Sequence, residues 1–249
     1  MVDDLRGGFG IKSKSVSISL IEETHENLHP IKENPVKASL ESKVALMLRA
    51  NDAAKAYSDK IQKVSVGLAS VCQNVQISNS EGRLVQDTRI RCRMSVSSFA
   101  QDGQNLQSGY EAPGASKGLE FFEERTPESI GKEASRIALV LLEAKDCPSG
   151  KMPVIIDNGF GGVIFHEACG HALEASSVSK NQSVFCNKLG QKVASDKVTA
   201  IDDGTIPNAW GSQNVDDEGN LQQKRVLIEN GILKSYMIDR LNGRRMGLE

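Results

Sequence analysis

Two histidines and a glutamate stand close together in the chain, which reads HEACGH from His166 to His171. Imidazole nitrogens are preferred ligands of Zn²⁺, and a neighbouring carboxylate can take a proton from a water molecule that the metal activates. The segment therefore predicts a zinc hydrolase centre, with His166 and His171 as metal ligands and Glu167 as the general base. The plainer alternative is a pair of ordinary histidines on a buried helix.

The spacing His-Glu-x-x-x-His is one residue longer than the common zincin motif. On a regular α-helix five residues turn through about 500°, so His166 and His171 would point about 140° apart. A π-turn closes an i→i+5 hydrogen bond and brings residues at this spacing onto one face. Gly170 has no Cβ, which lowers the cost of a local distortion. The spacing therefore predicts a helix that is irregular around residues 168–171.

A catalytic zinc ion needs three protein ligands and one open position, so two histidines are not sufficient. Glu167 directly follows His166 and is expected to point elsewhere, which favours the role of base over that of ligand. The residue types leave the third ligand open. The candidates are Cys169, Cys186, Cys147 and an acid such as Glu174.

Composition narrows the class of protein. The 249 residues suggest one large domain or two small ones, and 30 basic against 32 acidic residues give a net charge of −2. This balance gives no argument for a nucleic-acid partner or an anionic membrane. Apolar runs such as 137–142 are far too short to span a bilayer, and the start shows no secretory signal. Five scattered cysteines without a C-x-x-C pair favour a reducing, cytoplasmic compartment.

The elements that must position the centre fall into two groups, which predict an α+β fold with two domains. Residues 1–148 are expected to form an α/β domain with an antiparallel sheet. The apolar side of its first helix, which Ser39 can cap, is expected to contain Leu40, Val44, Met47, Leu48 and Ala54. The predicted strands are 15–21, 62–78, 90–96 and 107–111, and the predicted helices are 39–57 and 126–145.

Two groups of polar side chains in the first domain have both a binding interpretation and a plainer one. Arg89, Arg91 and Arg93 alternate with apolar residues and could meet a substrate carboxylate, but a solvated sheet face is favoured. His25 and His29 are four residues apart and could bind metal. They lie in a segment without helical pattern, so exposed loop histidines are favoured.

Residues 149–249 are expected to begin a second, β-rich domain, which is incomplete and carries the zinc helix. Residues 153–156 predict a short buried strand before that helix, and further strands are expected at 192–195 and 198–201. Asn230-Gly231 between the apolar runs 225–229 and 232–237 indicates a hairpin with a type I′ turn.

The ordered series of short motifs resembles the TldD/PmbA family of metallopeptidases, and its TldD branch most closely. The similarity runs from about residue 30 to the end, and the series is far more specific than any one motif. The matching stretches are residues 39–43, 79–82, 166–174, 193–195, 202–205, 209–212, 216–219 and 227–231.

The resemblance implies an α/β domain followed by a β-rich domain that carries the zinc helix. It implies a zinc peptidase that acts on small or unfolded peptides in a shielded cavity, with the substrate backbone held as an added strand. Members of this family mature microcin-type peptides, degrade an antitoxin, and carry the label "modulator of DNA gyrase". They assemble as homodimers or as heterodimers with a PmbA-type subunit.

Two departures from the family pattern bear on activity. In the family the third zinc ligand is a cysteine far downstream, and this sequence stops at Glu249. The front also lacks the first strand-and-helix unit before the turn at residues 7–10. We therefore expect a member truncated at both ends: either a zinc metallopeptidase, or an inactive fragment that binds only peptides or a partner subunit.

Overall fold

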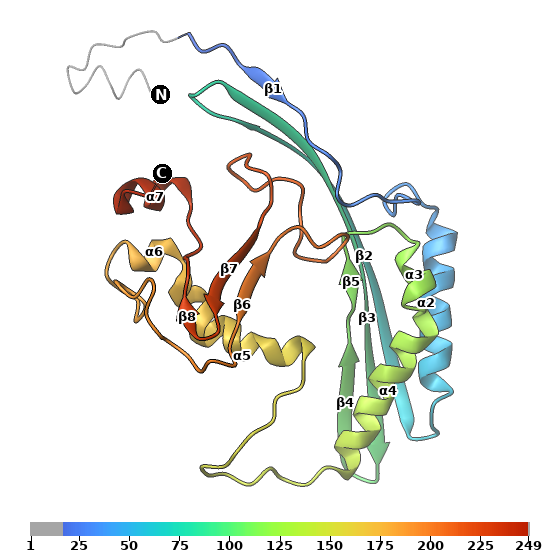
Figure 1. Cartoon of the computed structure of the whole chain (residues 1–249). Coiled ribbons are helices and arrows are strands. Elements are labelled where there is room, and N and C mark those ends of the chain that lie inside the picture. Colours follow the sequence, from blue (N-terminus) through green and yellow to red (C-terminus); the bar gives the residue numbers. More distant parts are fainter. Residues whose placement is uncertain (1–16, 249) are drawn as a thin grey trace, which may run out of the picture.

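Two long strands organise the first half of the protein, whose computed structural model describes residues 17–248 (Figure 1). Strands β2 (Ile61–Ser78) and β3 (Arg83–Asp102) pair antiparallel over almost their full length, and β4 (Asn105–Glu111) pairs antiparallel with β3. The predicted antiparallel sheet is thereby confirmed. Two short strands complete the sheet on β3: β1 (Ile21–Glu23), which is parallel to it, and β5 (Gly114–Ala115). The strand predicted at 15–21 falls partly outside the described residues.

Helices cover one face of this sheet (Figure 1). They are α2 (Leu40–Lys55), α3 (Phe121–Glu124) and α4 (Pro127–Glu143). The Ser39 hydroxyl accepts a hydrogen bond from the Ser42 amide, and the Thr126 side chain accepts one from the Ser129 amide. These caps satisfy amide groups that a helix start leaves without an intrahelical partner, so both helices begin where the sequence predicts.

The core of this half lies between β3 and the two long helices. Alternate residues of β3 point into it and are buried, as the period of two predicts: Cys92, Met94, Val96, Ser98 and Ala100. A side chain at Gly131 on α4 would clash with the Ala50 carbonyl on α2, so the helices approach closely through small residues.

The expected buried side of α2 is wrong in part. Leu40, Val44 and Leu48 are exposed, whereas Ala54 is fully buried and Met47 packs against the core, as expected. The reason is the close approach of α4, which meets α2 at the small residues Ala50 and Ala54 and leaves part of the expected side uncovered.

The second half begins after an extended linker, residues 144–158. Its helices include the segment 159–173, which carries the two histidines, and α6 (Ala175–Val178) and α7 (Arg240–Met246). Its three-stranded sheet contains β6 (Ala200–Asp203), β7 (Lys224–Glu229) and β8 (Ile232–Leu233). It has its own buried cluster, which includes Leu173, Phe185, Leu227 and Tyr236. Two domains with separate cores are therefore present, while the limits 1–148 and 149–249 stay predictions.

The turn between β7 and β8 follows the sequence closely. Asn230 and Gly231 have φ values of 49° and 80°, the two positive values that a type I′ turn requires. A side chain at Gly231 would also clash with the carbonyl oxygens of Ala194 and Ser195. Only glycine therefore fits the second position without strain.

Three strand predictions in this half are corrected. Residues 153–156 are extended but exposed, Ile155 completely so, and no described strand pairs with them. An apolar run becomes a buried strand only where neighbours supply hydrogen bonds and cover, and the described residues supply neither. Residues 192–195 form only an isolated bridge from Lys192 to Ile232, and the second arm of the hairpin ends at Leu233.

The arginine row of β3 contacts the second domain, so the favoured interpretation of a solvated face is wrong for Arg89 and Arg91 and holds only for Arg93, which is exposed. Arg89 donates to the Asp217 carboxylate at 2.8 Å and to the Val215 carbonyl at 3.0 Å. The guanidinium carbons of Arg91 and Arg93 lie 5.7 and 5.8 Å from the Trp210 ring. Arg89 and Arg91 are therefore partly buried in an inter-domain contact, whereas Arg93 touches the second domain and stays exposed.

Neither of the two early histidines is an exposed loop residue, and His29 belongs to the inter-domain contact. His29 Nδ1 accepts a hydrogen bond from the Asn208 amide at 2.9 Å, and His25 Nε2 donates to the Gln86 carbonyl at 2.9 Å. In the same contact between the domains, the side-chain amide of Asn214 donates to the buried Asp87 carboxylate at 2.9 Å.

None of the helices in the described part of the chain is long and apolar enough to cross a membrane.

We expect the Cys92 thiol to be inert in the folded protein. Burial raises the pKa of Cys92 to about 12, and the nearby Glu120 carboxylate contributes further. Because the thiolate is the reactive form, an aromatic disulfide reagent at pH 8 should modify the exposed Cys72 and Cys147 and leave Cys92 unmodified until urea unfolds the chain. Mass spectrometry identifies the modified residues. Modification of Cys92 at the rate of Cys72 would contradict the described core.

We expect Asp87→Ala to lower the free energy of unfolding by about 3 kcal/mol, since it leaves the buried Asn214 side chain without its carboxylate partner and removes the negative charge beside Arg89 Nε. The Asp87 side chain is 1% exposed and lies 3.5 Å from Arg89 Nε. Urea denaturation followed by circular dichroism measures the change. Asp102→Ala is the control, because Asp102 pairs with Lys60 at the surface, and its midpoint should hardly move. Equal shifts would show that the buried Asp87 carboxylate, which accepts from Asn214 of the second domain, contributes no more than a surface ion pair.

Candidate metal centre

The segment that carries the two histidines is a helix whose hydrogen bonding changes three times, from 3₁₀ to α, then to π and back to 3₁₀. It begins as η1 (Gly159–Gly162) and α5 (Val163–Phe165), widens to a π-turn at η2 (His166–Gly170), and tightens to η3 (His171–Leu173). The backbone amide of His171 donates to the carbonyl of His166, which is the i→i+5 bond of a π-turn. The predicted irregularity at residues 168–171 is confirmed.

The wider turn brings the two imidazole rings together. Their centroids are 4.5 Å apart and their planes are inclined by 69°. Glu167 Oε2 lies 3.9 Å from His171 Nε2, so the carboxylate shares this face, and the expectation that it points elsewhere is wrong. One donor atom from each of the three residues lies within 4.8 Å of the others, and residues 17–248 contain no second group of this kind.

Gly170 is not what permits the π-turn, contrary to the expectation from its missing Cβ. Its φ of −55° is an ordinary helical value. A Cβ added there would lie 3.6 Å from His166 Nδ1, which is normal van der Waals contact. The position therefore accepts a small side chain.

One carboxylate outside the motif fixes the second histidine. His171 Nδ1 lies 2.8 Å from Glu174 Oε1, and this hydrogen bond raises the pKa of His171. Glu174 was among the candidates for a third ligand, but its role as the partner of Nδ1 was not foreseen. The available signal was the i,i+3 spacing from His171, which places two side chains on neighbouring positions of a helix.

The cysteines proposed as third ligands lie elsewhere. Cys169 and Cys186 pack against the core of the second domain, and Cys186 Sγ donates to the Val178 carbonyl at 3.5 Å. Cys147 is exposed in the linker. None of them joins His166 and His171 in the described residues.

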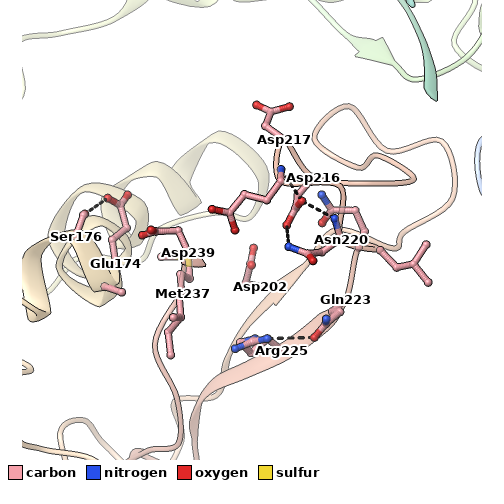
Figure 2. Close-up of a pocket in the computed structure, with 15 residues that line it drawn as sticks. Glu174, Ser176, Asp202, Asp216, Asp217, Asn220, Gln223, Arg225, Met237 and Asp239 are labelled. Atoms are coloured by element: carbon pink, nitrogen blue, oxygen red, sulfur yellow. Dashed lines mark hydrogen bonds between the residues drawn. The ribbon is translucent and has the colours of Figure 1, made fainter. Parts of the chain in front are cut away.

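An acidic cleft of about 630 Å³ adjoins the centre (Figure 2). Glu174 and Ser176 stand at one side of it, with Asp239 beside them, and Asp216 and Asn220 stand at the other. The Asp216 carboxylate accepts hydrogen bonds from the amides of Glu218 and Asn220, which fixes the loop at that side. The cleft therefore runs from Glu174, the hydrogen-bond partner of His171, to the loop that contains Asp217, which contacts Arg89 of the first domain.

These features define a two-domain α+β protein in which a π-turn joins two histidines and a glutamate in an arrangement that could hold a divalent metal ion. Residues 33–142 match the PmbA/TldA metallopeptidase central domain, and residues 149–249 match the PmbA/TldA metallopeptidase C-terminal domain. The chain belongs to the TldD/PmbA family.

Relatives with curated names support the assignment. A "Metalloprotease TldD homolog" from Buchnera aphidicola (subsp. Acyrthosiphon pisum) is 38% identical over 245 residues, which are 96% of this chain and 50% of the relative. A metalloprotease from Methanocaldococcus jannaschii is 42% identical over 217 residues, or 87% of this chain and 47% of the relative. The chain thus spans about half the length of the curated relatives it matches.

Solved structures share the fold. A Thermotoga maritima protein described as a candidate modulator of a DNA gyrase superposes with a TM-score of 0.80 at 25% identity, over 99% of this chain and 56% of that one. TldE from Thermococcus kodakarensis superposes with a TM-score of 0.68 at 21% identity, over 96% of this chain and 53% of that one.

We expect Gly170→Ala to be tolerated, because the backbone is helical and the space is available. Alanine should maintain or raise the urea midpoint, since Gly→Ala in a helix interior gains up to about 1 kcal/mol. Gly231→Ala is the matched control and should lower the midpoint, because its φ is 80° and its neighbours leave no room. Unfolding of Gly170→Ala at a lower urea concentration than the parent would show that the π-turn needs glycine.

Proposed function

We propose that this chain carries the zinc site of a metallopeptidase that hydrolyses small or unfolded peptides. The observation that carries the proposal is the hydrogen bond from the His171 amide to the His166 carbonyl, because it brings two imidazoles and Glu167 to one place. The family membership and the curated metalloprotease relatives support the same activity.

The donor set suits zinc. Two imidazole nitrogens with an adjacent carboxylate are typical ligands and base of a catalytic zinc site. With Nδ1 of His171 bonded to Glu174, its Nε2 is the atom left to bind, and it is the nitrogen that lies 3.9 Å from Glu167. A bound zinc ion would act as a Lewis acid and would lower the pKa of water to about 7.

Glu167 is proposed as the general base. Its carboxylate takes a proton from the attacking water as the water oxygen bonds to the scissile carbonyl carbon, and it then gives the proton to the leaving amine as the C–N bond breaks. The cleft beside Glu174 offers space for the peptide on the exposed side of the centre. Loose sequence preference would follow if the cleft holds the peptide mainly through its backbone.

The assembly and the location are proposals of the same kind. A homodimer, or a heterodimer with a PmbA-type subunit, would shield the exposed centre, in which the His171 side chain is 54% exposed. A cytoplasmic location agrees with five free cysteines among the described residues.

A second candidate function is binding of peptides or of a partner subunit without catalysis. The observation that favours it is the absence of a third ligand beside the two histidines among residues 17–248. Zinc with only two protein ligands would bind weakly, and the chain would then retain only its binding surfaces.

Elemental analysis of the purified chain decides between the two. The metallopeptidase predicts about one zinc ion per chain, lost in His166→Ala. Glu167→Gln should keep the zinc and lower cleavage of an unfolded peptide by about 10²–10⁴-fold, since it removes the base and not a ligand. Zinc well below one per parent chain would favour the binding function. Undiminished cleavage by Glu167→Gln would contradict the role of that residue.

A further inference from the structure

We propose that Glu174 is a positioning residue that holds the proton of His171 on Nδ1 and so reserves Nε2 for the metal. The inference rests on the proposed function for its purpose, but its geometric part can be tested without metal. Glu174 lies outside the histidine motif and acts only through His171.

The hydrogen bond itself identifies the tautomer. An ionised carboxylate has no proton to donate, so the 2.8 Å contact between Glu174 Oε1 and His171 Nδ1 requires the proton on Nδ1. In a neutral imidazole the other nitrogen then carries the lone pair. That nitrogen, Nε2, is the one that faces the Glu167 carboxylate.

Glu174 is held in place through its side chain and through the backbone around it. The Ser176 hydroxyl donates to Glu174 Oε2 at 3.2 Å, and Figure 2 shows this contact at the edge of the cleft. The Glu174 amide donates to the His171 carbonyl at 3.3 Å. The amide of the next residue, Ala175, donates to the Met237 carbonyl at 2.8 Å. Glu174 is thus bonded to the turn that carries His171, and the next residue, Ala175, is bonded to Met237 in the segment between β8 and α7.

This placement also removes Glu174 from the set of third ligands. The lone pairs of the two imidazole nitrogens point away from each other, so a group bonded to Nδ1 lies on the far side of the ring from an ion at Nε2. Histidines that bind metals commonly donate their second N–H to a carboxylate in this way, and loss of such a partner typically lowers metal affinity 10–100-fold.

The first test is nitrogen NMR of the imidazole rings in the metal-free chain, at a pH above the His171 pKa. In the parent the His171 proton should be on Nδ1. In Glu174→Ala the proton should move wholly or partly to Nε2, and in Glu174→Gln, whose amide oxygen still accepts, it should remain on Nδ1. Asp202→Ala is the control, because it removes a carboxylate from the same cleft. A parent tautomer with the proton on Nε2 would overturn the proposal, whether or not the protein binds zinc.

The second test is zinc affinity by competition with a chelator. Glu174→Ala should bind zinc about 10–100-fold more weakly than the parent, Glu174→Gln by an intermediate factor, and Asp202→Ala equally well. Parent affinity in a folded Glu174→Ala, verified by circular dichroism, would overturn the positioning role. Failure of the parent to bind zinc would count against the proposed function, while the tautomer result would stand.

Discussion

The hydrogen bond from the His171 amide to the His166 carbonyl is the interaction on which the proposed centre depends. In a regular α-helix the His171 amide would bond the carbonyl of Glu167 instead, and the two imidazoles would lie on different faces. One wide turn removes this mismatch, and the following 3₁₀ turn leads to Glu174, whose carboxylate meets the second imidazole. The wide turn therefore fixes the pairing of the histidines, and the 3₁₀ turn that follows it places the carboxylate that orients His171.

The rest of the structure supports this short segment from both domains. Leu173, just after the turn, is fully buried in the core of the second domain. Arg89 on the long strand β3 of the first domain binds Val215 and Asp217, and the same loop lines the far side of the cleft that begins at Glu174. The inter-domain contact thus fixes one wall of the cleft, and the helix fixes the other.

Much of this could be predicted from the sequence wherever the determinant is local. The caps at Ser39 and Thr126, the Asn230-Gly231 turn and the π-turn all follow from residue type and spacing over a few positions. The errors concern contacts between distant segments. Alternation showed that Arg89, Arg91 and Arg93 share a face, but Trp210 and Asp217, which cover that face, come more than a hundred residues later. The exposed leucines of α2 depend in the same way on Gly131 of α4, and the role of Glu174 depends on side-chain geometry that spacing alone does not give.

The most direct test of the central claim is X-ray diffraction from zinc-soaked crystals of this chain at wavelengths on either side of the zinc absorption edge. The account predicts an anomalous difference peak at about 2.0–2.1 Å from His171 Nε2 and from one ring nitrogen of His166, with Glu174 still bonded to His171 Nδ1. A peak on Nδ1 of His171, or an anomalous map with no peak between the two histidines, would contradict it.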